Sequence, residues 1–129
     1  MVQGLTNKIL RVNLTNRRIS VDEPNELFYR RYLGGAAFVA YYLLKEMKPG
    51  AHPLSPDNIL IFALGPMTGS AMPGGARNCI GAKSPLSGGM AKSEVGGFFG
   101  YELKRAGFDT LIVEGRASTP VYLWIHSGE

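Results

Sequence analysis

Arg77 is the residue whose type and setting best suit it to bind a ligand. It stands in the run Pro73-Gly74-Gly75-Ala76-Arg77-Asn78, where small neighbours leave its side chain little to pack against. Glycine permits tight turns and close approach of the backbone to another group, and ten of the chain's seventeen glycines lie between Gly65 and Gly100. A guanidinium in this setting offers a planar fork of donors to a phosphate, a carboxylate or another electron-rich acceptor.

Glu94 is the second candidate, because it precedes the pair Gly96-Gly97. A carboxylate here could accept hydrogen bonds from a ligand or from the amides of a following helix. The residues alone also allow a plain surface side chain at this position.

Cysteine, histidine and phosphate-loop chemistry have weaker support. The single cysteine, Cys79, cannot by itself hold an iron–sulfur cluster or a structural zinc ion. Nearby Arg77 could lower the pKa of its thiol, but the pattern favours a small, half-buried strand residue. His52 and His126 have no cysteine or carboxylate at ligand spacing, so no metal or catalytic dyad is expected. Neither GxxxxGK[ST] nor GxGxxG occurs, which argues against a nucleotide site.

Composition indicates one globular domain. A chain of 129 residues that is 45% hydrophobic can bury a core without disulfides or metal ions. One cysteine favours a reducing, cytoplasmic location. No apolar run approaches the roughly 20 residues that span a bilayer, so no membrane partner is expected.

The net charge of +4 comes from the N-terminal third of the chain. Residues 1–48 contain eight Lys/Arg against four Asp/Glu, and residues 49–129 contain six against six. The excess lies away from the glycine-rich segment and lacks interleaved aromatic residues, so no nucleic-acid partner is expected.

The elements that must position these residues follow from the hydrophobic periodicity. Alternation predicts a β-hairpin over residues 8–14 and 19–22. A period of three to four residues predicts one helix from Pro24 to the Pro49-Gly50 stop, loosened at Gly34-Gly35. The apolar run over residues 58–64 predicts a central strand covered on both faces.

Shorter elements follow toward the C-terminus. Strands are predicted around residues 78–82 and 90–95, a short helix between Gly97 and Gly107, and strands over residues 110–114 and 121–126. Because the order lacks a regular alternation of strands and helices, the fold class is α+β.

An ordered series of short motifs resembles the N-terminal domain of the tungsten-containing aldehyde ferredoxin oxidoreductases. The resemblance covers almost the whole chain in one order. The motifs are residues 7–15 (NKILRVNLT), 32–35 (YLGG), 53–58 (PLSPDN), 65–69 (GPMTG), 83–86 (KSPL), 96–99 (GGFF), 102–104 (ELK), 106–109 (AGFD) and 113–115 (VEG).

The resemblance implies a fold of two packed β-sheets with two helices, which forms a base for a bis-pterin cofactor of tungsten or molybdenum. Residues 1–129 would then be a single domain, the N-terminal cofactor-binding portion of a longer oxidoreductase. The covering helical domains, which supply the four cysteines of a [4Fe–4S] cluster, are absent from these residues.

The resemblance also implies roles for particular residues. Arg77 matches an arginine between the pterin and the cluster. Glu94 stands where the best-known members have asparagine, whose backbone carbonyl helps to bind a magnesium ion joining the pterin phosphates. Gly96 matches a glycine whose backbone contacts the cofactor, and Ala76 replaces a glycine.

The implied function is oxidation of aldehydes to carboxylic acids, with electrons passed through the cluster to ferredoxin. The implied partners are the remaining domains of the same enzyme and ferredoxin, and a homo-oligomer is compatible. Two alternatives stay open. One is a stand-alone or split module that binds a pterin or a partner protein without catalysis, and the other is a purely structural interaction domain.

Overall fold

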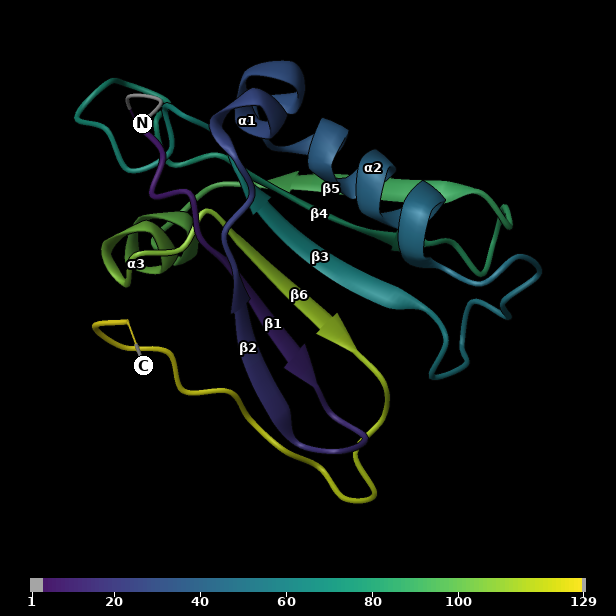
Figure 1. Cartoon of the computed structure of the whole chain (residues 1–129). Helices are drawn as coiled ribbons and strands as arrows, with labels where there is room; N and C mark the ends of the chain where they lie inside the picture. The colour runs from purple at the N-terminus through teal and green to yellow at the C-terminus, as the bar shows by residue number, and fades with distance from the viewer. Residues whose placement is uncertain (1–3, 129) are drawn as a thin grey trace.

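The computed structural model describes residues 4–128, which form one mixed sheet of six strands and three helices (Figure 1). The strand order across the sheet is β2-β1-β6-β3-β4-β5. Strands β1 and β6 pair in parallel, and the other neighbours pair antiparallel. The strands are β1 (Ile9–Asn13), β2 (Arg18–Asp22), β3 (Ile59–Leu64), β4 (Asn78–Lys83), β5 (Met90–Val95) and β6 (Thr110–Glu114).

The α+β class is confirmed, but two of its expected details are wrong for the described residues. The strands form a single sheet and not two packed sheets. There are three helices and not two, namely α1 (Glu26–Tyr32), α2 (Ala36–Glu46) and α3 (Phe99–Arg105).

The additional helix arises because the predicted helix over residues 24–47 is broken and not merely loosened. Asn25 caps α1, its side chain accepting from the Phe28 N–H at 3.0 Å. Helix α1 then ends at Leu33, which has φ +60°. Gly34 and Gly35 also have positive φ, so the chain turns before α2 begins. The hydrophobic periodicity predicted one continuous helix, because apolar residues at helical spacing stand on both sides of this turn.

Helices α1 and α2 cover one face of the sheet and build the larger core. Tyr29, Phe38 and Val39 are fully buried against the sheet residues Ile9 and Ile61. The β1–β2 hairpin and the central place of β3 are confirmed. The prediction that β3 is covered on both faces is only half correct, because Leu60 on the opposite face is 39% exposed.

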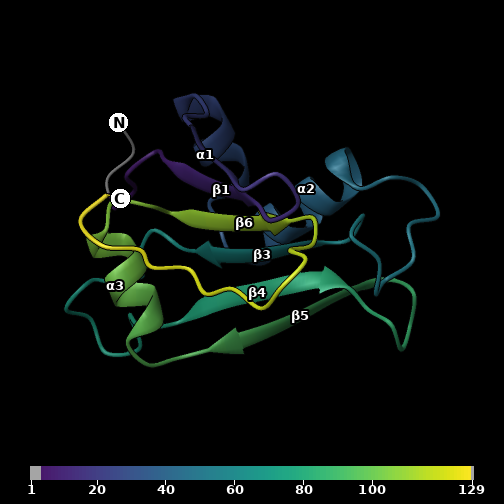
Figure 2. The same ribbon diagram turned by 90° about the horizontal axis from the view of Figure 1, so that it is seen from below.

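That opposite face carries α3 and the C-terminal segment, which runs beneath the sheet (Figure 2). Leu103 and Phe108 pack here against Leu10 and Leu111, with Ile125 at the margin. The strand predicted over residues 121–126 is wrong: this segment is extended and pairs with no described strand. Its apolar alternation is present, but no neighbouring strand within the described chain offers backbone partners.

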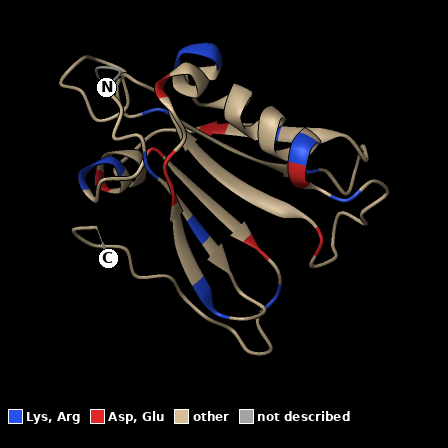
Figure 3. Cartoon of the chain, in the orientation of Figure 1, with Lys and Arg blue, Asp and Glu red and all other residues tan. Residues whose placement is uncertain are grey.

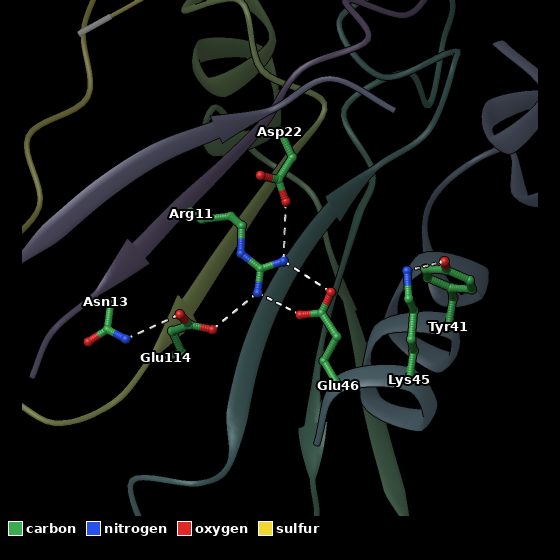
Figure 4. A network of polar contacts seen from close by, with 7 residues as sticks. All are labelled: Arg11, Asn13, Asp22, Tyr41, Lys45, Glu46 and Glu114. Atoms are coloured by element: carbon green, nitrogen blue, oxygen red, sulfur yellow. Dashed lines mark hydrogen bonds and ion pairs between the residues drawn. The ribbon is translucent and has the colours of Figure 1, made fainter. Parts of the chain in front are cut away.

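Arg11 joins four elements through its guanidinium (Figure 4). It binds Asp22 of β2 at 3.3 Å, Glu46 of α2 at 2.6 Å and Glu114 of β6 at 3.1 Å. The hydrogen bonds that Arg11 donates to the Glu46 and Glu114 carboxylates raise its pKa, against the effect of burial. Elsewhere basic and acidic residues are interspersed over helices, strands and loops (Figure 3).

Candidate functional site

A hollow of about 320 Å³ lies where β3 ends and β4 begins. Its walls come from the start of α2, the loop over residues 65–75, the first residues of β4, and β5. The hollow brings Arg77 and Glu94 together, whereas Gly96 does not line it. The two side chains predicted from the sequence therefore share one site.

Glycines allow the start of α2 to approach the end of β3. Gly34 has φ +128°, and a Cβ added there would run into the carbonyl oxygen of Leu64. The Gly35 N–H donates to the same carbonyl at 3.1 Å. One wall of the hollow is therefore backbone packed on backbone, which a larger residue at position 34 would disrupt.

The loop between β3 and β4 is held closed by its own backbone. The Gly69 N–H donates to the Gly75 carbonyl at 2.8 Å, and the Gly75 N–H donates to the Met72 carbonyl at 2.9 Å. The hydroxyl of Tyr101 in α3 donates to the Ser70 carbonyl at 2.9 Å. The chain leaves this closed loop at Arg77, directly before β4.

The Arg77 side chain is exposed and has no partner among the described residues. Its guanidinium makes no hydrogen bond or ion pair within residues 4–128, so its five N–H donors are available to another molecule. Its charge acts on Glu94, where it helps to lower the pKa of the carboxyl group. Arg77 therefore places a positive charge at an open hollow, and its guanidinium stabilises no other part of the described fold.

Glu94 lies on edge strand β5, in register with Cys79 of β4. The ammonium of Lys92 donates to its carboxylate at 2.6 Å. This hydrogen bond and the Lys92 charge, with a smaller contribution from Arg77, lower the pKa of Glu94. The carboxylate therefore stays ionised and its charge is offset. Lys92 could not be recognised as a site residue from local patterns, because its pairing with Glu94 depends on two alternate residues sharing one face of β5.

Gly96 follows the end of β5. A Cβ added to it would meet no atom of the described chain within 4 Å, and its φ is not in the left-handed region. The fold itself therefore does not require glycine here.

The N-terminus of α2 adds positive potential to the same hollow. Its N-cap, Gly35, provides no side-chain hydrogen bond, and its first turn contains no acidic residue. The N–H groups of Ala36 and Ala37 have no backbone acceptor in the described part of the chain. These unpaired amides, together with the helix dipole, favour an anion beside Arg77.

Thr68 is a site residue for which the sequence alone suggested no role. It is 5% exposed, lines the hollow, and hydrogen-bonds to the backbone of Gly65 and Arg77. The available signal was a hydroxyl residue three positions after a strand-ending glycine, which is typical of a side chain bonding back to the turn.

Of the other titratable candidates, Cys79 also lines the hollow, whereas His52 and His126 do not. Cys79 is 3% exposed, and burial raises the pKa of its thiol, with Lys92 opposing the rise and Glu94 adding to it. It is more deeply buried than the sequence indicated. Over residues 4–128, no group of three or more His, Cys, Asp or Glu side chains could hold a metal ion. No described helix is long and apolar enough to cross a membrane.

The same fold occurs in a solved redox enzyme. The active-site complex BamBC of benzoyl coenzyme A reductase, solved with 1,5-dienoyl-CoA, superposes with a TM-score of 0.95 at 36% sequence identity. The match covers 100% of this chain and 20% of the solved chain. The shared fold at this level of identity therefore places the chain in the class of oxidoreductase domains.

The model of the aldehyde ferredoxin oxidoreductase N-terminal domain matches residues 9–129. The chain is 52% identical over 123 residues to the tungsten-containing aldehyde ferredoxin oxidoreductase of Pyrococcus abyssi, and 46% identical over 122 residues to that of Pyrococcus furiosus. It belongs to the aldehyde ferredoxin oxidoreductase family, and the resemblance read from its motifs is confirmed. Each match covers 95% of this chain and 20% of the relative, so the chain spans about a fifth of their length.

Proposed function

We propose that this chain is the cofactor-bearing part of an enzyme that oxidises aldehydes to carboxylic acids. One structural observation carries the proposal: Arg77, an arginine without a partner among residues 4–128, lines an open hollow whose walls include four glycines. The names of its relatives support tungsten as the metal. The remaining four-fifths of the enzyme would cover the hollow and provide the substrate pocket.

The residues of the hollow suit a phosphate-bearing pterin. Arg77 would donate hydrogen bonds to its electron-rich groups, and the unpaired amides at the start of α2 would favour its negative charge. Gly96 would let the cofactor approach the backbone without obstruction.

Glu94 would serve through its backbone carbonyl as a ligand of a magnesium ion between the pterin phosphates. An edge strand leaves half of its backbone groups without a strand partner, so some carbonyl oxygens of β5 are available to a metal ion. The glutamate brings a charge that asparagine would not. Lys92 offsets that charge at 2.6 Å, which supports an unchanged backbone role for this position.

When bound, the metal–pterin group would supply the two-electron oxidation of the aldehyde. The task of this chain is to hold the group and set its electrostatic surroundings. Arg77 would offset negative charge on the pterin and on a neighbouring [4Fe–4S] cluster, and so raise the cluster's reduction potential. The cluster ligands would come from other domains, because the only cysteine here is buried in β4. Ferredoxin would accept the electrons.

The substitution Arg77→Ala in the complete enzyme tests this proposal. We expect about a tenfold loss of tungsten and pterin per polypeptide, which is within the range for residues that support a metal centre. Arg105→Ala is the matched control, because the Arg105 side chain is 76% exposed and pairs with Glu102 on the surface of α3. Equal tungsten and pterin contents in the two variants would refute the proposed role of the hollow.

A second candidate is a pterin- or partner-binding module without catalysis of its own. It would account equally well for the single buried cysteine and for the absence of a metal-binding cluster in the described residues. The mass of the native polypeptide separates the two candidates. A product several times heavier than 14.0 kDa supports the enzyme, and a native product of 14.0 kDa supports the module.

A further inference from the structure

Thr68 connects the two strands that border the hollow. Its hydroxyl oxygen accepts the Gly65 N–H at 3.0 Å and donates to the Arg77 carbonyl at 2.7 Å. Gly65 directly follows β3, and Arg77 directly precedes β4. One side chain thus ties the exit of one strand to the entrance of the next, and both functions of its hydroxyl are used.

The methyl group of Thr68 is also fixed in place. A Cβ added to Gly100 at the start of α3 would come within 3.0 Å of the Thr68 Cγ2 atom. Helix α3 therefore packs closely on the methyl side, while the hydroxyl faces the backbone. With 5% of its surface exposed, Thr68 has no room to rotate and exchange these two groups.

The direction of the Arg77 side chain depends on this connection through Thr68. Its head group makes no hydrogen bond or ion pair in the described chain, so no direct contact at the guanidinium end fixes where the side chain lies. Its direction is set from the backbone, by the pairing of Asn78 with Leu64 on one side and by the Thr68 hydroxyl on the other.

We propose that Thr68 is the positioning residue for Arg77, and that its hydroxyl holds the Arg77 backbone so that the guanidinium faces the anionic cofactor. The inference rests on the proposed function of the hollow. Without the hydroxyl, the Arg77 carbonyl and the Gly65 N–H would lose their partner and would turn toward water or other donors. The start of β4 would then shift, and Arg77 would shift with it.

The test compares Thr68→Val, Thr68→Ser, Arg77→Ala and the double variant Thr68→Val/Arg77→Ala in the complete enzyme. The readouts are tungsten and pterin per folded polypeptide and the midpoint potential of the iron–sulfur cluster. Thr68→Val keeps the shape but removes the hydroxyl, and we expect about a tenfold loss of cofactor. Thr68→Ser keeps the hydroxyl and should stay within about twofold of the native protein.

The double variant distinguishes a role of Thr68 in positioning Arg77 from a general weakening of the cofactor site. If Thr68 acts through Arg77, the double variant loses no more cofactor than Arg77→Ala alone, and the two shifts in potential do not add. Full additivity, or native cofactor content in Thr68→Val, would overturn the inference. Should Thr68→Val fail to fold, the difference between Thr68→Ala and Thr68→Ser isolates the hydroxyl in the same way.

Failure of the underlying proposal gives a different pattern. Native tungsten and pterin contents in Arg77→Ala would refute the role of the hollow itself, whatever Thr68→Val does. A loss in Arg77→Ala without one in Thr68→Val would refute only the positioning role.

Discussion

The carboxylate of Asp109, which is fully buried, lies 2.7 Å from the ammonium group of Lys104. The same carboxylate accepts the backbone N–H of Asn7 at 2.7 Å, and the Lys104 ammonium donates to the Gly4 carbonyl at 2.9 Å. The N-terminal segment is thereby held where a Cβ on Gly4 would contact the Pro66 carbonyl. The buried ion pair between Asp109 and Lys104 therefore holds the N-terminal segment against Pro66, in the loop that forms one wall of the hollow.

Asp109→Asn should lower the free energy of unfolding by about 3 kcal/mol. The substitution leaves the Lys104 ammonium, which is 14% exposed, without a counter-charge. Urea unfolding of the purified protein measures the change. Glu102→Gln, which alters an exposed ion pair on the same helix, should change stability by about 0.5 kcal/mol or less. Equal effects of the two variants would contradict a special role for the buried pair.

Gly34→Ala should destabilise the fold by about 3 kcal/mol. Position 34 has φ +128°, and the new Cβ would contact the Leu64 carbonyl. Gly107→Asn is the control, because Gly107 follows α3 with φ +93° and has open space around an added Cβ. Asparagine tolerates the left-handed conformation at such a helix end at a cost of about 1 kcal/mol. Thermal unfolding midpoints rank the two, and a smaller loss for Gly34→Ala would disprove the packing of α2 on the end of β3.

Because its thiol is buried, Cys79 should make the folded protein less stable at alkaline pH. Burial raises the pKa of its thiol above the ordinary value of 9.0, so the folded chain holds this proton more tightly than the unfolded chain does. The stability from this group is complete below that ordinary pKa and falls as the pH rises through it toward the higher folded pKa.

Urea unfolding from about pH 8 to about pH 10 tests this expectation. The free energy of unfolding should decrease more steeply in the native protein than in Cys79→Ala. Tyr29 and Tyr42, whose pKa values burial also raises, act in both proteins and cancel in the comparison. Parallel pH profiles would show that the thiol is not protected in the fold.

Local patterns in the sequence were enough to predict most elements, but not their pairing. Alternation at Leu10 and Val12 located β1, because the signal lies within a few residues. The break at Gly34 was missed, since its cause is contact with Leu64, far along the chain. Residues 121–126 show the reverse case: the alternation is real, but a strand also requires a neighbouring backbone.

The candidate site was predicted in part for the same reason. Arg77 could be identified from its own neighbours, because an arginine among small residues has little local packing to do. Its approach to Glu94 depends on the register of β4 and β5, and the Lys92 contact depends on which face of β5 each side chain occupies. The hydrogen bond from Thr68 joins it to a residue nine positions further along the chain, across a loop whose path is set by backbone contacts. The spacing of motifs along the sequence cannot predict any of these three contacts.

The location of tungsten in crystals of the complete enzyme tests the central claim most directly. Anomalous scattering at a tungsten absorption edge locates the metal without assumptions about the cofactor. We predict that the metal–pterin group lies over the hollow, with the Arg77 guanidinium within about 3.2 Å of its acceptor atoms. A tungsten site remote from the hollow, with Arg77 covered only by protein, would contradict the account.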